Sequence, residues 1–169
     1  MSTADIPNTL PDVAEIDFRN AMASFASGVT IVTTRDETGK PWGFTASSFA
    51  SLSLHPPMVL VCMGKRARAY DVFTQARIFA VSILNADQAH LARLFSTRGA
   101  DRFGDAAIID SPKGFPVAAG ALAQLDCALE ILHPGGDHAI LIGRPLSIRL
   151  NPGQPLLHWD RRMGGFTES

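Results

Sequence analysis

Two segments of this sequence carry side chains that could bind a polar ligand. The first is GFTASSFASLSLHPP, residues 43–57, in which the hydroxyls of Ser47, Ser48, Ser51 and Ser53 lie close together. Hydroxyls and backbone N–H groups along a groove can hydrogen-bond the edge of a flat heterocycle or a phosphate without adding charge. A solvated serine-rich loop has the same composition, so the residues alone leave both interpretations open.

The second segment is GKRARAYD, residues 64–71, which contains Lys65, Arg66 and Arg68. These basic residues follow a predicted buried strand and precede a predicted helix. Basic side chains beside the start of a helix can bind an anion such as a phosphate. A solvated surface loop is again the alternative. If the chain folds the two segments together, the serine-rich segment would line a ring and the basic segment would bind a phosphate.

Other kinds of catalytic chemistry lack their motifs here. The chain has no G-x-G-x-x-G after a strand, no Walker loop and no G-x-S-x-G nucleophile elbow. Its five histidines are scattered, and no Cys/His cluster has the spacing of a zinc site. Standard dinucleotide folds, nucleophilic catalysis, metal catalysis and P-loop chemistry are therefore poor interpretations.

The elements that must position these segments are mostly strands. β-branched and alternating patterns predict strands over residues 29–35, 41–46, 58–64, 78–84, 121–133, 138–150 and 155–160. Pro145 is a candidate break in the long strand over residues 138–150. The serine-rich segment is expected to leave its strand at Thr45 and to re-enter a strand at Met58. Residues 100–116 have no clear period and are expected to form a loop.

Two or three helices are expected beside these strands. One begins at Asp17 as N-cap, places Phe18, Met22 and Phe25 on one face, and ends at Gly28. The others cover residues 69–76 and 87–96, with turns at residues 36–40 and 134–137. About seven strands with helices inserted between them predict a β-rich fold, a closed or split antiparallel barrel.

The length and composition indicate one domain. The chain has 169 residues, of which residues 1–14, with Pro7 and Pro11, are expected to form a flexible arm before a single domain over residues 15–169. Charged residues make up only 18%, which indicates apolar surface covered by a partner chain, and a homodimer is the default assembly. The net charge of −1 gives no general attraction to nucleic acid or to anionic lipid.

The location follows from features that are missing. The amino terminus lacks the basic and apolar regions of a signal peptide, and no apolar run is long enough to span a bilayer. Cys62 and Cys127 lie in apolar runs, which is typical of small buried side chains and does not indicate a disulfide framework. We therefore expect a cytoplasmic protein without a membrane partner.

Five blocks, in order, resemble the flavin reductase family with its split-barrel flavin-binding fold. They are FRNAMASFASGVTIVTT, GFTASSFASLSLHPPMVLVC, FAVSIL, GDHAILIG and PLLHWDRR, and they extend from Phe18 to Arg162. Proteins of this family are the small reductase components of two-component flavin monooxygenases. The resemblance implies a split antiparallel Greek-key β-barrel with a few peripheral helices.

The resemblance also implies site residues and a reaction. Hydride would pass from NADH or NADPH to FMN or FAD, and the reduced flavin would diffuse to a partner monooxygenase. His138 would bind or orient the nicotinamide nucleotide, whereas a locally hydrogen-bonded turn histidine is the structural alternative. The implied flavin-binding residues are Thr45, Ala46, Ser47, Ser48, Ser51, Leu52, Ser53, Arg66 and Arg68, and the implied nicotinamide-binding residues are Gly136, Asp137 and His138.

The chain departs from the family pattern at two positions, and other functions stay open. Many relatives carry Asn where Ser47 stands and Tyr where Met163 stands. A flavin-binding electron carrier that retains FMN is the alternative function, and a non-enzymatic ligand-binding barrel is a third. The sequence does not decide between FMN and FAD or between NADH and NADPH.

Overall fold

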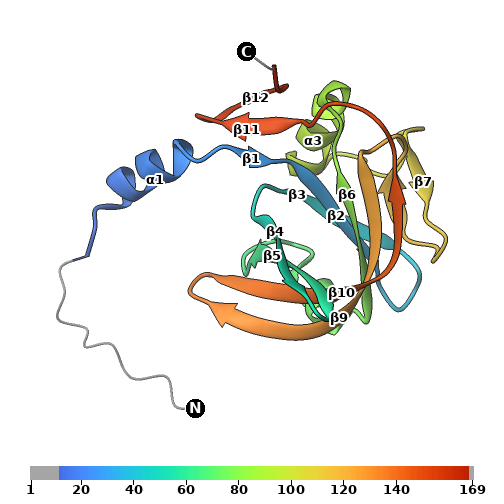
Figure 1. Cartoon of the computed structure of the whole chain (residues 1–169). Coiled ribbons are helices and arrows are strands. Elements are labelled where there is room, and N and C mark those ends of the chain that lie inside the picture. The colour runs from blue at the N-terminus through green and yellow to red at the C-terminus, as the bar shows by residue number, and fades with distance from the viewer. Residues whose placement is uncertain (1–11, 168–169) are drawn as a thin grey trace.

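A seven-stranded antiparallel sheet forms the body of the protein. The computed structural model describes residues 12–167. The strands run in the order β3-β2-β6-β9-β10-β5-β4, so the two edge strands, β3 and β4, are consecutive in the chain. Figure 1 shows this sheet curling into a barrel that is split between those edges, as the predicted fold class requires. The bounds are β2 (Thr30–Arg35), β3 (Pro41–Ala46), β4 (Phe49–Leu54), β5 (Pro57–Gly64), β6 (Ile78–Ile83), β9 (Ala123–Gly135) and β10 (His138–Leu150).

Two apolar clusters hold the strands in place. The first fills the barrel and contains the fully buried Val61, Phe73 and Phe79. The second lies beneath α3 (Ala89–Ser96), where Leu91 and Phe95 are buried one helical turn apart. Each buried Leu or Phe contributes about 1.5–3 kcal/mol through removal of apolar surface from water. α3 therefore packs closely on the barrel, which matters because its C-terminal end borders the site described below.

The remaining strands form two small sheets. β1 (Ser27–Gly28) pairs with β11 (Leu157–Trp159), which pairs with β12 (Arg162–Gly164). β7 (Ile108–Asp110), which lies inside the segment predicted to be a loop, pairs with β8 (Pro116–Ala118), which begins at the last residue of that segment. The loop prediction was wrong for these residues because three-residue strands are too short to show a period. β12 was not predicted for the same reason.

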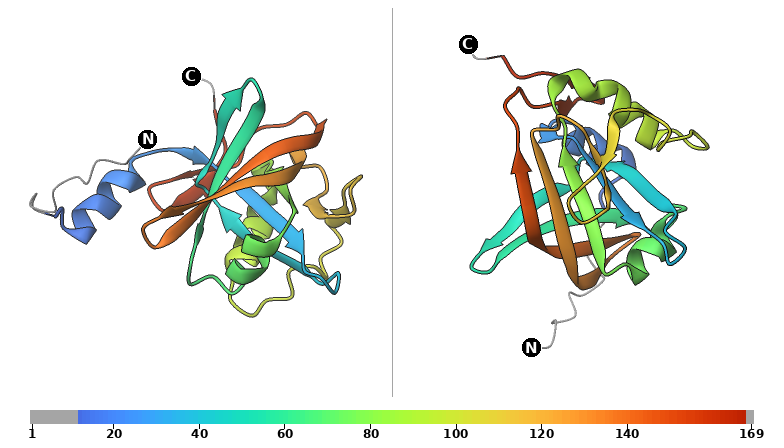
Figure 2. Two further views of the ribbon diagram at one scale, coloured as in Figure 1. Left: turned by 90° about the horizontal axis from the view of Figure 1, so that it is seen from below. Right: turned by 90° about the vertical axis from the view of Figure 1, so that its right-hand side faces the viewer.

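The N-terminal helix differs from its prediction. α1 spans Glu15–Ala23, begins after Ala14 instead of at Asp17, and ends before Ser24. Gly28 does not end the helix, because it lies in β1, paired with Leu157. The predicted apolar face exists but is not buried: Phe18 is 58% exposed and Met22 is 54% exposed. Figures 1 and 2 both show α1 projecting away from the barrel.

The serine-rich segment is a strand for much of its length. β3 runs to Ala46 and β4 begins at Phe49, so only Ser47 and Ser48 link them, whereas a loop from Thr45 to Met58 was predicted. The chain turns at His55 and Pro56, and β5 begins at Pro57, one residue before the predicted re-entry at Met58. Serines are tolerated in β4 because an edge strand exposes side chains to water. β10 is not interrupted at Pro145, where its register with β9 shifts instead.

The other helices agree with their predictions. α2 spans Tyr70–Gln75, and a short 3-10 turn, η1 (Ala86–Gln88), leads into α3. Of the predicted flexible arm, residues 1–14, only residues 12–14 are described, and the rest lies outside the described residues. Among the helices within residues 12–167, none is long and apolar enough to cross a membrane.

Candidate functional site

A groove of about 600 Å³ lies where three parts of the chain meet. One wall is β3, which contributes Gly43, Phe44 and Thr45. A second wall is formed by residues 66–69 of the β5–α2 loop, which spans residues 65–69, and the third is the end of α3 with the segment that follows it. The groove therefore brings together β3 and the basic loop. These belong to the two separate segments that the sequence indicated as candidates for ligand binding.

Four arginines line this groove. Arg66 and Arg68 come from the β5–α2 loop, as the sequence indicated, whereas Arg98 and Arg102 follow α3. No aspartate or glutamate is among the lining residues. Guanidinium groups without carboxylate neighbours attract phosphate and can bind it through paired N–H donors. The charge and the volume of the groove suit an anionic ligand of the size of a nucleotide.

Arg102 is held in place by the backbone around the groove. Its Nη1 donates to the carbonyl oxygen of Gly43 at 3.2 Å, and its Nη2 donates to that of Thr97 at 2.9 Å. Its buried Nε has no hydrogen-bond partner in the described structure. A guanidinium held at two points on the groove wall is oriented before any ligand arrives. Sequence reasoning missed Arg98 and Arg102, and the only signal was a pair of arginines four residues apart in a weakly patterned segment.

Some of the predicted flavin-binding residues near this groove have side chains that already contact other parts of the protein. Thr45 lines the groove, but its hydroxyl donates to the carbonyl oxygen of Ala92 in α3 at 2.6 Å. Ala46 is buried in the barrel core. The hydroxyl of Ser48 donates to the carbonyl oxygen of Cys62 in β5 at 3.1 Å. Thr45 and Ser48 thus fasten the β3–β4 link to the neighbouring elements.

The other predicted serines are available to a ligand but do not line the groove. Ser47 and Ser51 are exposed, Ser53 is half-buried, and Leu52 is exposed on β4. Within residues 12–167, the hydroxyls of Ser47, Ser51 and Ser53 make no hydrogen bond to protein. They lie along the split edge of the barrel, next to β5, and their binding role stays a prediction.

The predicted nicotinamide-binding residues form the β9–β10 turn. Gly136 has a φ of +61°, a conformation that glycine adopts without steric cost. The ring Nδ1 of His138 lies 2.7 Å from the Asp137 carboxylate. That hydrogen bond, with the charge of His138 and a smaller effect of Arg66, lowers the pKa of Asp137. The ring of His138 is half-exposed, so its other nitrogen can meet a ligand.

The basic loop and this turn are in direct contact. The backbone N–H of Lys65 donates to the carbonyl oxygen of Asp137 at 2.9 Å, and Lys65 Nζ donates to that of Gly136 at 2.6 Å. His138 pairs with Gly64 in the β5–β10 register. Since Arg66 lines the groove and Lys65 touches the turn, the groove and the turn adjoin.

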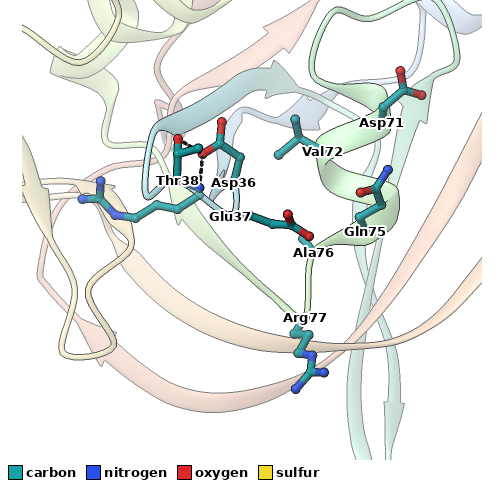
Figure 3. A pocket seen from close by; sticks show the side chains of 9 residues that line it. Asp36, Glu37, Thr38, Asp71, Val72, Gln75, Ala76 and Arg77 are labelled. Carbon is teal, nitrogen blue, oxygen red and sulfur yellow. Dashed lines mark hydrogen bonds between the residues drawn. The ribbon is translucent and has the colours of Figure 1, made fainter.

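A second hollow, of about 480 Å³, lies between the β2–β3 turn and α2 (Figure 3). It contains none of the predicted site residues. Asp36, on its rim, accepts hydrogen bonds from Thr38 Oγ1 at 2.6 Å and from Trp42 Nε1 at 2.9 Å. These bonds, that of Thr38 first, lower the pKa of Asp36 to about 2. The carboxylate of Asp36 therefore stabilises the β2–β3 turn.

The remaining reactive groups add no catalytic centre. Within residues 12–167 no group of His, Cys, Asp and Glu side chains is arranged to hold a metal ion. Burial first, and the neighbouring Asp126 second, raise the pKa of Cys127 to about 12. This thiol stays protonated at neutral pH, as expected for a small buried side chain.

Comparison with known proteins gives consistent matches over nearly the whole chain. The model of the flavin reductase like domain matches residues 22–167. The reductase subunit HsaB of a flavin-dependent monooxygenase from Rhodococcus jostii is 41% identical over 150 residues, which is 88% of this chain and 76% of that protein. The NADH:riboflavin 5′-phosphate oxidoreductase of Streptomyces pristinaespiralis is 41% identical over 165 residues, 96% of this chain and 93% of that protein.

A solved structure shows the same arrangement of strands. It is the NADH:FAD oxidoreductase of Streptomyces globisporus in complex with NAD and FAD fragments. The two chains are 37% identical, superpose with a TM-score of 0.85, and match over 90% of this chain and 92% of that one. The family match over residues 22–167 includes the segments that build the groove and the turn.

Proposed function

The chain belongs to the flavin reductase family and is an NAD(P)H:flavin oxidoreductase, and from this premise we propose where its two ligands bind. The arginine groove holds the flavin, with the phosphate toward Arg66, Arg68, Arg98 and Arg102. The β9–β10 turn holds the nicotinamide nucleotide through His138. The observation that supports this assignment most is the convergence of four arginines without a carboxylate.

The chemistry of these side chains fits a flavin nucleotide. FMN and FAD both carry phosphate, and four guanidinium groups supply more donors than a single phosphate needs. The groove wall formed by Gly43 and Phe44 is apolar beside this charge, as a flat ring beside a phosphate requires. NADH is the reductant named for the relatives, and we propose that this chain uses it.

The reaction is hydride transfer from the nicotinamide to the flavin, a step that these molecules carry out themselves once they are aligned. This chain has three tasks: binding the phosphate, fixing the orientation of the rings and excluding water. Arg102, held by Gly43 and Thr97, serves the first task. No acid–base pair is required of the protein, and the site contains no buried carboxylate–histidine pair.

The serine-rich segment keeps the role that the resemblance implies, as a proposal. Backbone groups at Thr45, Ala46, Ser47 and Ser48 would line one edge of the flavin ring. Ser51, Leu52 and Ser53 would extend this lining along the split of the barrel. The unpaired hydroxyls of Ser47, Ser51 and Ser53 support this role because they can replace water at a polar edge without a charge.

We also propose that the reduced flavin leaves and reaches a partner monooxygenase. The relatives include reductase subunits of flavin-dependent monooxygenases, which supports this partner. An exposed, open groove allows the flavin to exchange. The alternative, an electron carrier that retains FMN, predicts instead a protein that stays yellow through purification.

A homodimer and a cytoplasmic location complete the proposal. α1 has no buried residue, and it exposes Ile16, Phe18 and Met22 to solvent. A helix whose apolar face stays largely exposed within residues 12–167 is suited to contact with a second copy of the chain. Two free cysteines and no disulfide support a reducing compartment.

The first test is NADH oxidation by the purified protein with and without added FMN, FAD or riboflavin. We expect turnover that depends on free flavin and a lower KM for FMN or FAD than for riboflavin, because riboflavin lacks the phosphate that the arginines would bind. If the purified protein is yellow and its rate of NADH oxidation does not change when flavin is added, the electron-carrier alternative is favoured instead. If NADH is not oxidised and no flavin binds, the proposed function is wrong.

A further inference from the structure

The β5–α2 loop and the β9–β10 turn form one connected unit, although they are far apart in the sequence. Lys65 joins them twice, by its backbone N–H to Asp137 and by its ammonium group to Gly136, 71 residues away. The antiparallel pairing of β5 with β10 places Gly64 opposite His138 and so fixes both segments. The residue after Lys65, Arg66, lines the groove.

We propose that Lys65 is a positioning residue that couples flavin binding to nicotinamide-nucleotide binding. This inference rests on the proposed function, because it assigns the flavin to the groove and the nucleotide to the turn. The Lys65 ammonium holds the turn and touches neither ligand. Its effect on each ligand is carried through the backbone of the segment from Lys65 to Arg66.

The physical basis is shared ordering of two exposed loops. A flavin phosphate held by Arg66 and Arg68 fixes the β5–α2 loop, and the contacts of Lys65 transmit that order to Gly136 and His138. A nucleotide that binds second then meets a turn that is already ordered, so it loses less conformational entropy. Coupling of this kind is reciprocal, so the nucleotide must tighten flavin binding by the same factor.

The charges of the two loops favour the same coupling. Arg66 is near enough to Asp137 to contribute to the lowering of the carboxyl pKa, although the hydrogen bond from His138 is the larger cause. The Asp137 side chain is 92% exposed and bonds to the ring of His138. Movement of the basic loop therefore changes the surroundings of both Asp137 and His138.

Lys65→Met tests the proposal because it removes the ammonium and keeps the alkyl chain. The measurement is FMN binding by fluorescence titration, with and without saturating NAD⁺, which cannot reduce the flavin. In the unmodified protein we expect NAD⁺ to tighten FMN binding about fivefold or more, within the usual range of coupling. In Lys65→Met we expect this factor to fall to about one.

Two further variants separate positioning from charge and from stability. Lys65→Arg can still donate to the carbonyl oxygen of Gly136, so it should keep most of the factor. Lys113→Met removes one exposed lysine from the β7–β8 turn and should leave the factor unchanged. Equal melting temperatures of the variants would show that the loss in Lys65→Met is local.

The outcomes distinguish this inference from the proposed function. If the unmodified protein binds FMN but NAD⁺ has no effect, or if Lys65→Met keeps the full factor, the coupling role of Lys65 is wrong and the flavin site stands. If the unmodified protein binds no FMN, the proposed function fails and the coupling fails with it.

Discussion

At the scale of single residues, the site is made of side chains whose neighbours already hold them. Arg102 is held by Gly43 and Thr97, and Lys65 by Gly136. His138 is held by Asp137, which orients one ring nitrogen and leaves the other free. Arg66, Arg68 and His138 could be selected from the sequence, because basic runs and the family motif are local signals. Arg98 and Arg102 could not, since nothing in their own segment indicates a groove.

His138→Ala is expected to weaken the use of NADH more than the binding of flavin. We expect the KM for NADH to rise roughly tenfold, which corresponds to the loss of one contact of about 1.4 kcal/mol. The KM for flavin should change less than twofold. Steady-state NADH oxidation at several flavin concentrations measures both. His133→Ala, an exposed histidine of the same hairpin, is the matched control. An unchanged KM for NADH together with an unchanged rate would leave His138 as a structural turn histidine.

At the scale of elements, the β9–β10 hairpin reaches from the barrel core to the predicted nucleotide turn. Its inner part packs tightly: a Cβ at Gly143 would lie 2.6 Å from Cε1 of Phe79 and 3.1 Å from Cβ of Cys127. Phe79 and Cys127 are both fully buried. Glycine at this position therefore lets β10 cross close to the core, and the strand can continue through Pro145 to Leu150.

Gly143→Ala is expected to destabilise the protein by about 1–3 kcal/mol, because the added methyl group overpacks the core against Phe79. Urea unfolding followed by tryptophan fluorescence measures the change in the free energy of unfolding. Gly164→Ala is the control, since no atom lies within 4 Å of its added Cβ. Equal stability of Gly143→Ala and the parent protein would mean that β10 moves away from Phe79 at little cost.

The serine-rich segment shows how an element can be misread locally. Phe49–Leu54 forms an edge strand that hydrogen-bonds only to β5 within the described residues, so its side chains are mostly exposed. Exposure removes the apolar alternation by which a strand is usually identified. Ser51 and Ser53 therefore resemble loop residues, although the backbone at β4 is extended and paired with Val59 and Met58.

At the scale of the whole molecule, α1 projects away from the barrel in Figure 1 and in the left view of Figure 2. Two contacts connect it to the β11–β12 turn: Asp160 N–H donates to the carbonyl oxygen of Ala23, and Arg161 donates to Asn20. Neither contact buries the apolar face that carries Phe18 and Met22. A second copy of the chain that packs on this face would cover it.

The proposed homodimer predicts a mass in solution of twice the 18.1 kDa of one chain. Met22→Asp should shift the mass toward one chain, because a charge in a dry interface loses its hydration without gaining a partner. Ile109→Asp, which adds the same charge at an exposed position in β7, should keep the dimer. Light scattering after size-exclusion chromatography measures the mass. A parent protein with the mass of one chain would contradict the dimer.

The sequence by itself determined the β-rich class, most strand and helix positions, the family resemblance and the basic residues Arg66 and Arg68. These properties depend on local periodicity and on short motifs, both of which can be recognised in the amino-acid sequence itself. Only the tertiary structure decided that Arg98 and Arg102 join the groove and that Lys65 meets Gly136. Such contacts depend on the register of β5 with β10 and on the packing of α3 on the barrel, because these bring together segments that are distant in the chain.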